Sequence, residues 1–294
     1  RYLKDNNYRV IPLSKLVDMI RERGAVDQRQ VVITIDDGYK SLYANAYPVL
    51  REFGYPFTVF LPTEPVDKGY RSSLTWDQVR RLKSEGVDFQ DHSYSHGRMG
   101  DIPAGADRKS YRERIRDDLG KSIMAFKSNL GQTPRYFAIP YGEYNEILID
   151  EAMRLGYEAV FSQDPGPVSA DTPVFRIPRE PILGREWSTL DHFRKVLQRV
   201  DLPIKSHDPS IEPYRGGPIG HFGARLLYPG RYRPETLGIY ISELGWRKGK
   251  LSGDYLKVDG AESLQQRINR VAVSGIEKTT GRTAIRFWMI IKQP

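Results

Sequence analysis

Strand-like and helix-like segments alternate through the first 200 residues of this 294-residue chain, and this alternation constrains the fold more than any other feature. Short apolar runs rich in β-branched and aromatic residues are typical of buried strands, whereas apolar residues at every third or fourth position are typical of helices. The pattern predicts strands at 31–36, 57–61, 87–90, 136–139 and 158–161, and helices at 45–53, 75–85, 108–129, 145–155 and 188–200. Repeated strand–helix units predict a parallel sheet, open or closed into a barrel, with functional residues at the carboxyl ends of its strands.

The sequence changes character after about residue 200. Residues 201–220 are rich in Pro and Gly and indicate a linker or an irregular entry to a second domain. Alternating apolar and polar residues then recur between Gly-containing turns, which is typical of antiparallel strands. We therefore expect an α/β domain over residues 1–200 and a small all-β, sandwich-like accessory domain over residues 201–294.

Composition excludes several classes of protein. The chain has no run of eighteen apolar residues, so we expect no transmembrane helix. It has no cysteine, which excludes disulfides, thiolate metal sites and a cysteine nucleophile. The net charge is +8, but acidic and basic residues are interleaved, which favours a mixed solvated surface over a nucleic-acid site. Because the chain starts at Arg1 within an amphipathic pattern, we interpret it as truncated at its N-terminus, where a signal peptide could precede it.

Two adjacent carboxylates, Asp36 and Asp37, follow an apolar run that ends a predicted strand. Neighbouring residues on a regular strand point to opposite faces, so both can serve one site only where the backbone turns, and Gly38 permits such a turn. One aspartate could ligate a metal while the other accepts a proton from water that the metal activates. A plain Asp-Asp-Gly turn closing a hairpin is the alternative.

Two histidines, His92 and His96, stand at the end of another predicted strand. The residues between them are weak helix formers and no Glu follows the first histidine, so a helical HExxH zinc site is disfavoured. Two imidazoles and a carboxylate from a neighbouring strand end would form a two-His-one-Asp metal site with open positions for water. Ordinary surface histidines are the alternative.

A third segment, residues 136–145, predicts a strand followed by a tight turn at Pro140-Tyr141-Gly142. Backbone N–H groups at such a turn can bind a developing oxyanion. The rings of Tyr141 and Tyr144 offer flat faces for a sugar. Viewed alone, the segment could equally be an ordinary strand-to-helix turn.

Together the three segments resemble the polysaccharide deacetylases, the NodB-homology or carbohydrate esterase family 4 domain. The family's first motif, Thr-Phe-Asp-Asp-Gly, corresponds to residues 34–38, its His-Ser/Thr-x-x-His motif to 92–96, and its Arg-x-Pro-Tyr/Phe-Gly motif to 138–142. The motifs occur in the family's order, and the resemblance covers roughly residues 1–200. It is closest to the subgroup that acts on the exopolysaccharide poly-N-acetylglucosamine.

The resemblance implies a distorted (β/α) barrel with fewer than eight strands. It implies that Asp37, His92 and His96 hold a divalent metal, usually Zn²⁺ and sometimes Co²⁺ or Ni²⁺, and that Asp36 is the general base. The implied reaction removes N-acetyl groups from an N-acetylglucosamine-containing polysaccharide and releases acetate. An extracytoplasmic location, periplasmic, secreted or at the cell envelope, follows from such a substrate.

The resemblance also implies contacts with the sugar polymer. The main-chain N–H of Tyr141 would help to hold the oxyanion, with Pro140 beside it in the turn. Trp187 is a further candidate for stacking on sugar rings, although core packing is an alternative for it. We expect no nucleic-acid partner. The accessory domain could bind carbohydrate, dock a partner or act as a structural module.

Two positions depart from the family pattern. The third motif's arginine, which orients the base, is replaced by Ala138, and Arg135 lies three residues away. The general acid of the family is a histidine in a late Leu-x-x-His-like motif, and none of the later histidines fits it: His192, His207 and His221. In the exopolysaccharide subgroup the motifs are permuted and this histidine lies near the N-terminus, so we expect the acid upstream of Arg1.

The motifs encode the metal and the base but not the acceptor. A deacylase acting on another acylated sugar, through an O-acetyl or formamide group, therefore remains an alternative. A catalytically impaired carbohydrate-binding homologue that retains the metal is another.

Overall fold

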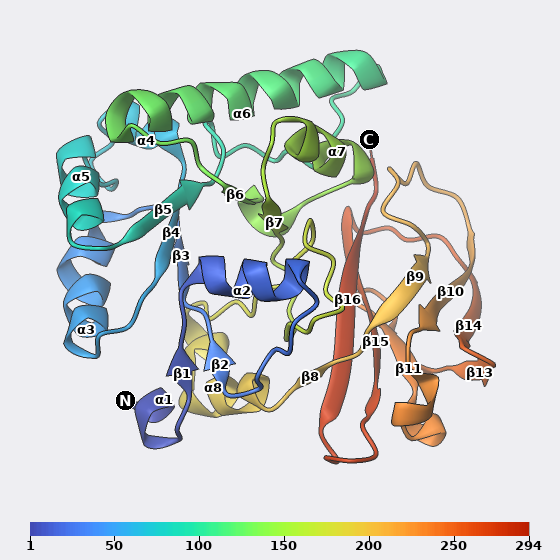
Figure 1. The fold of residues 1–294 in the computed structure, drawn as a ribbon. Helices are drawn as coiled ribbons and strands as arrows, with labels where there is room; N and C mark the ends of the chain where they lie inside the picture. The colour runs from blue at the N-terminus through green and yellow to red at the C-terminus, as the bar shows by residue number, and fades with distance from the viewer. Residues whose placement is uncertain (294) are drawn as a thin grey trace.

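A computed structural model describes residues 1–293 of the chain (Figure 1). Five parallel strands form the sheet of the N-terminal half, in the spatial order β3-β4-β5-β6-β7. The sheet curls as an incomplete barrel, so the expected α/β fold with fewer than eight strands is confirmed. The strands are β3 (Thr34–Asp36), β4 (Thr58–Leu61), β5 (Asp88–Asp91), β6 (Tyr136–Ala138) and β7 (Ala159–Phe161).

The predicted strand at 31–36 is divided in two, because the chain changes its pairing partner at Val32 and Ile33. β2 (Gln30–Val31) pairs in parallel with β1 (Arg9–Val10), whereas β3 pairs with β4. Leu13 and Val17 of the N-terminal segment share a buried cluster with Phe60 of β4 and Ala138 of β6.

Helices cover the N-terminal half, with α6 and α7 along one side in Figure 1. Thr75 and Gln78 form a capping box at the start of α5, and Gly131 ends α6 in a left-handed conformation. The predicted helix at 45–53 instead begins with a π-helical turn at Leu42–Ala46. The helices are α1 (Tyr2–Asp5), α2 (Leu13–Arg21), α3 (Tyr47–Glu52), α4 (Thr63–Asp67), α5 (Trp76–Ser84), α6 (Arg108–Leu130), α7 (Glu146–Arg154) and α8 (Leu190–Leu197).

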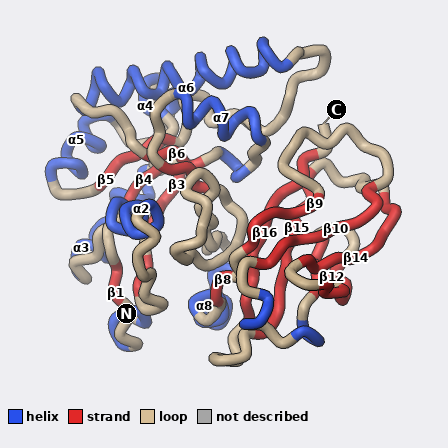
Figure 2. The backbone as a smooth tube through the Cα atoms, turned by 45° about the vertical axis from the view of Figure 1, so that its right-hand side comes forward, coloured by secondary structure: helices blue, strands red, loops and turns tan. Residues whose placement is uncertain are grey.

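The C-terminal half consists of two sheets, seen as the cluster of strands at the right of Figure 2. One has the order β13-β14-β10-β9 and the other β12-β11-β15-β16-β8, and among the described strand pairs of these sheets β16–β8 alone is parallel. The strands are β8 (Val200–Asp201), β9 (Ile204–Asp208), β10 (Ile219–Leu226), β11 (Gly238–Ile241), β12 (Gly245–Lys248), β13 (Lys250–Ser252), β14 (Tyr255–Glu262), β15 (Ile268–Ile276) and β16 (Thr283–Ile291).

Apolar side chains of both C-terminal sheets share one core, including Phe222, Leu256 and Trp288, as expected for a sandwich. The segment 201–220 is not wholly irregular, because β9 within it pairs with β10. A division of the chain between residues 200 and 201 stays a prediction.

The two halves also share a core. Met289 and Ile291 of β16 belong to the same buried cluster as Tyr144 and Ile147 of the N-terminal half. Within the described residues, no helix combines the length and the apolar character that a membrane crossing requires.

Candidate active site

Asp37, His92 and His96 come together at the carboxyl ends of β3 and β5. The Nε2 atom of His96 lies 3.0 Å from Oδ1 of Asp37, and Nε2 of His92 lies 3.6 Å from the same oxygen. One potential ligand atom from each residue lies within 4.8 Å of the other two. Two imidazole nitrogens and one carboxylate oxygen suit a divalent metal such as Zn²⁺ and leave coordination positions open.

The turn after β3 explains how two consecutive aspartates face one site. Asp37 has a φ of 70° and Gly38 a φ of 58°, both in the left-handed region, so the alternation of a strand ends at Asp36. A Cβ atom on Gly38 would lie only 2.2 Å from Cδ1 of Leu61. Gly38 is therefore required for space as well as for its conformation, and the predicted role of this glycine in the turn is confirmed.

The loop after β5 is also held in an unusual conformation. Ser93 and His96 have φ values of 69° and 53°. The buried carboxylate of Asp91 accepts hydrogen bonds from the backbone N–H of Ser93 and from the Ser122 hydroxyl, both at 2.7 Å, and Ser93 Oγ accepts one from the backbone N–H of His96. Strained backbone that the surroundings fix in this way is typical of functional sites.

His92 is oriented by the neighbouring strand β6. Its ring is 1% exposed, and its Nδ1–H donates to the main-chain oxygen of Ala138 at 2.7 Å. Burial lowers the pKa of His92, so the ring stays neutral and Nε2 carries the free lone pair that faces Asp37. A neutral imidazole whose tautomer is fixed by a carbonyl is the usual state of a metal-ligating histidine.

The guanidinium group of Arg179 makes a bidentate contact with the carboxylate of Asp36. Nη1 and Nη2 of Arg179 lie 2.6 Å and 2.9 Å from the two carboxylate oxygens of Asp36. Burial alone would raise the pKa of Asp36, but the charge and the hydrogen bonds of Arg179 outweigh burial, and the pKa is lowered to about 2. Asp36 is therefore an oriented, ionised carboxylate that lies 3.8 Å from His92 Nε2.

Arg179 was missing from the sequence prediction. Arg135, the alternative considered there, instead forms a surface ion pair with Glu158. Arg179 lies in the segment that follows β7, where Ile177 bridges Phe161 and so extends the sheet. An arginine just beyond an apolar residue that continues the sheet is a weak signal, but it could have marked this position.

The residues that the sequence predicts to contact the substrate differ in how far their side chains are exposed. Tyr141 has a φ of 59°, is 40% exposed, and its ring centroid lies 4.9 Å from that of His96. Pro140 is buried beneath the turn. Tyr144 is 2% exposed, so the expectation that it offers a face to a sugar is wrong, because its ring belongs to the core.

Trp187 is 45% exposed, which contradicts core packing, and its ring stacks on His192 rather than on a residue of the site. The other late histidines lie on β9 and β10, where His207 contacts Arg176 and His221 contacts Tyr255. Among the described residues, no contact joins these histidines to Asp36 or Asp37.

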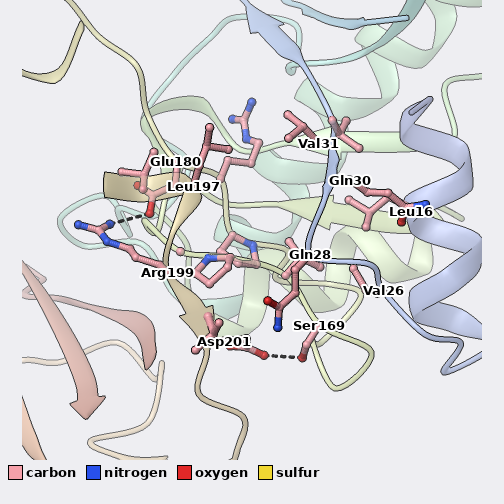
Figure 3. Close-up of a pocket in the computed structure, with 18 of the residues that line it drawn as sticks. Leu16, Val26, Gln28, Gln30, Val31, Ser169, Glu180, Leu197, Arg199 and Asp201 are labelled. Atoms are coloured by element: carbon pink, nitrogen blue, oxygen red, sulfur yellow. Dashed lines mark hydrogen bonds and ion pairs between the residues drawn. The ribbon is translucent and has the colours of Figure 1, made fainter. Parts of the chain in front are cut away.

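A cavity of about 700 Å³, drawn in Figure 3, lies beside the site but is not part of it. Thr34 and Arg179 contribute to its wall, whereas the three candidate metal ligands do not. In Figure 3, Arg199 points to Glu180 and Ser169 to Asp201, and both pairs line the cavity. Of the residues discussed for the site, Thr34 and Arg179 border this cavity.

Residues 23–160 match the family model described as polysaccharide deacetylase. Among curated proteins, a putative polysaccharide deacetylase, YxkH, of Bacillus subtilis is 25% identical over 179 residues, which is 61% of this chain and 61% of that protein. The poly-β-1,6-N-acetyl-D-glucosamine N-deacetylase of Escherichia coli K12 is 28% identical over 203 residues, covering 58% of this chain and 30% of that protein. The chain thus spans less than two thirds of the length of these relatives.

Two solved structures have the same fold as the N-terminal half. The Streptococcus pyogenes deacetylase PplD in complex with acetate is 22% identical with a TM-score of 0.58, covering 66% of this chain and 82% of that one. The deacetylase domain of BpsB from Bordetella bronchiseptica is 24% identical with a TM-score of 0.56, covering 61% and 81% of the two chains. At these identities the comparison carries the fold alone.

Proposed function

Because residues 23–160 belong to the polysaccharide deacetylase family, we propose that this protein is a metal-dependent hydrolase that removes N-acetyl groups from an N-acetylglucosamine-containing polysaccharide. The N-deacetylase of Escherichia coli acts, by its name, on poly-β-1,6-N-acetyl-D-glucosamine, and this polymer is the first substrate to test. The reaction adds water to the acetamide carbonyl, breaks the C–N bond, and releases acetate and a free amine.

Asp37, His92 and His96 would hold the metal, since their donor atoms already converge and His92 presents a neutral Nε2. Zn²⁺ fits two imidazoles and one carboxylate best, and Co²⁺ or Ni²⁺ fit the same set. When bound, the metal supplies Lewis acidity, which polarises the acetamide carbonyl and lowers the pKa of water at the site.

The bidentate contact between Arg179 and Asp36 is the observation that carries the proposal. It gives the two adjacent aspartates separate roles, because Asp37 faces both histidines while Asp36 is held by a cation and ionised. Asp36 is thus oriented as the general base that accepts a proton from the attacking water. Its low pKa keeps it in the proton-accepting form at neutral pH.

Tyr141 would contact the substrate. Its ring lies beside that of His96, and because it is partly exposed it could stack on a sugar. Its main-chain N–H would stabilise the oxyanion that develops on the acetamide oxygen. Pro140 would fix this turn from below, and Trp187 would contact the polymer farther from the reacting group.

An exported polysaccharide as the substrate would place the protein outside the cytoplasm, in the periplasm, at the cell envelope or secreted. We also propose that residues 1–200 form a deacetylase domain and residues 201–294 a β-rich accessory domain.

Acetate release tests the proposal. The full-length protein, reconstituted with Zn²⁺, is incubated with β-1,6- and β-1,4-linked N-acetylglucosamine oligomers beside the variant Asp36→Asn. We expect release by the wild type and a loss of about 10²- to 10⁴-fold in the variant, since a general base contributes that much. No release of acetate by a zinc-loaded wild type would contradict the proposal and favour another acyl substrate or a binding role.

A further inference from the structure

Glu143 joins the candidate active site to the β sandwich. It follows the Pro140-Tyr141-Gly142 turn, is 1% exposed, and its Oε1 atom accepts hydrogen bonds from two arginines. Arg98, just beyond His96, provides one of them. Arg267, which immediately precedes β15, provides the other through Nη2 at 2.6 Å.

Arg98 extends this contact to the residues of the site. Its guanidinium carbon lies 4.3 Å from the centroid of the Tyr141 ring, within the range of a cation–π interaction. The ring of Tyr141 in turn contacts the ring of His96. A continuous set of side-chain contacts therefore runs from Arg267 through Glu143, Arg98 and Tyr141 to His96.

The sandwich also holds the backbone of the loop that follows His96. Gln293 accepts a hydrogen bond from the backbone N–H of Ile102 at 2.7 Å and donates one to the main-chain oxygen of Gly100 at 3.2 Å. Arg267 pairs with Asp101 through its second nitrogen. The loop is thus tied to the C-terminal half at three consecutive residues.

Close packing leaves this junction little freedom. A Cβ atom on Gly100 would lie 2.7 Å from Cδ1 of Ile291 and 2.8 Å from the backbone of Glu143. Glu143 is also a buried carboxylate, and removing one of its two arginine partners leaves its charge less well compensated, which is more disruptive than the loss of a surface pair. The junction can therefore transmit a change at Arg267 to the turn at Tyr141.

We propose that Arg267 is a positioning residue for the active site: through Glu143 and Arg98 it fixes Tyr141 and the loop of His96, so the β sandwich is an integral part of the catalytic centre. This inference rests on the proposed deacetylase function for its catalytic consequence. The contacts themselves are independent of that function, and so is one of the two measurements below.

The first measurement is hydrogen exchange on the metal-free protein. Arg267→Met is compared with wild type and with Arg225→Met, which breaks a 2.8 Å ion pair with Asp254 within the same sandwich. We expect faster exchange at residues 97–102 and 140–145 in Arg267→Met only. Unchanged exchange in both segments would overturn the proposal, whether or not the protein is a deacetylase.

The second measurement is the kinetics of acetate release by the zinc-loaded full-length variants. Misplacing Tyr141 should lower kcat by about 10- to 100-fold while KM changes little, because the oxyanion contact forms only in the transition state. Arg225→Met should retain the wild-type kcat. A wild-type kcat in Arg267→Met would overturn the proposal, whereas absence of acetate release from the wild type would contradict the deacetylase function and leave the exchange result to decide.

Arg267→Lys separates positioning from general structural support. Lysine keeps the charge but cannot hold Glu143 and Asp101 with a fork of nitrogens. We expect kcat between those of wild type and Arg267→Met at an unchanged melting temperature. If Arg267→Met does not fold, Arg267→Lys decides: wild-type exchange and kcat in this variant would overturn the proposal.

Discussion

Asp36 and Asp91 occupy equivalent places, at the last residues of β3 and β5 in one parallel sheet, but their surroundings shift their pKa values in opposite directions. Burial raises the pKa of both carboxyl groups. At Asp36 the guanidinium of Arg179 reverses that effect, and the pKa falls to about 2. At Asp91 only neutral donors are available, from Ser93, Ser122 and Tyr157, and burial keeps the pKa at about 7.

The difference shows what assigns a role to a carboxylate at a strand end. A cation in bidentate contact makes Asp36 an ionised group that is ready to accept a proton, whereas hydrogen bonds without a cation make Asp91 a support for the loop that carries the histidines. Position in the sheet brings both groups to the site, and their partners decide what each can do.

Replacing Arg179 should remove the difference in pKa between Asp36 and Asp91. We expect it to reduce acetate release more than any other change except the loss of Asp36 itself. In Arg179→Met the carboxylate of Asp36 loses both its orientation and its main compensating charge, so its pKa rises. We expect acetate release to fall by about 10²-fold, the size of effect that a misplaced catalytic group produces. The acid limb of the pH–rate profile should also move to higher pH.

The control for this prediction is Arg176→Met, three residues earlier on the same segment, where the guanidinium contacts His207 instead of Asp36. It should retain most of the activity. Equal losses in the two variants would mean that the segment as a whole, and not the contact with Asp36, supports activity.

Asp91→Asn should change how stability depends on pH. The pKa of Asp91 in the folded protein, about 7, lies above the ordinary value of 3.8. The folded state therefore binds this proton more tightly, and the stabilisation is complete below pH 4 and lost as the pH rises to 7. Asn cannot ionise, so the unfolding free energy of wild type relative to that of the variant should fall by about 4 kcal/mol between pH 4 and pH 7.

Asp36→Asn should change the pH dependence of the unfolding free energy in the opposite direction. The lowered pKa of Asp36 stabilises the fold above pH 4, and this stabilisation is lost as the pH falls towards 2. Chemical denaturation across pH, with a chelator present, measures both slopes. Parallel pH profiles for the two variants would contradict the contrast between the two strand ends.

Gly38→Ala should have the smallest effect, and it concerns the turn that gives Asp36 and Asp37 their different partners. Alanine would be strained at a φ of 58° and would crowd Leu61, and we expect a loss of about 2 to 4 kcal/mol in unfolding free energy. Gly54→Ala is the matched control, since Gly54 has a φ of 64° with nothing within 4 Å of the added Cβ. It should lose only about 1 to 2 kcal/mol, so equal losses would exclude crowding by Leu61.

The sequence predicted the parts of the molecule that depend on local pattern. The apolar strands and the turn at Gly38 follow from residues close together in the chain, and both were predicted, apart from the division of the strand at 31–36. The convergence of one of the two aspartates with His92 and His96 also followed, because carboxyl ends of parallel strands meet at one edge of a sheet, and the family resemblance implied that this aspartate is Asp37.

What the sequence could not predict depends on distant contacts. Arg179 lies 143 residues from Asp36 in a segment without periodic pattern, and its one local signal, the apolar Ile177 two residues earlier, is weak. The burial of Tyr144 is set by the junction with β16. The strand β9 was not predicted, because its composition resembles that of a linker and only its pairing with β10 makes it a strand.

Zinc binding to the two single variants Asp36→Asn and Asp37→Asn, measured side by side by isothermal titration calorimetry, tests the central claim most directly. If Asp37 is a metal ligand and Asp36 a base held by Arg179, Asp36→Asn should bind zinc with nearly wild-type affinity. Asp37→Asn should bind it at least about 10-fold more weakly, since a ligand is lost. Equal affinities in the two variants, or a greater loss in Asp36→Asn, would contradict the division of roles between the two aspartates.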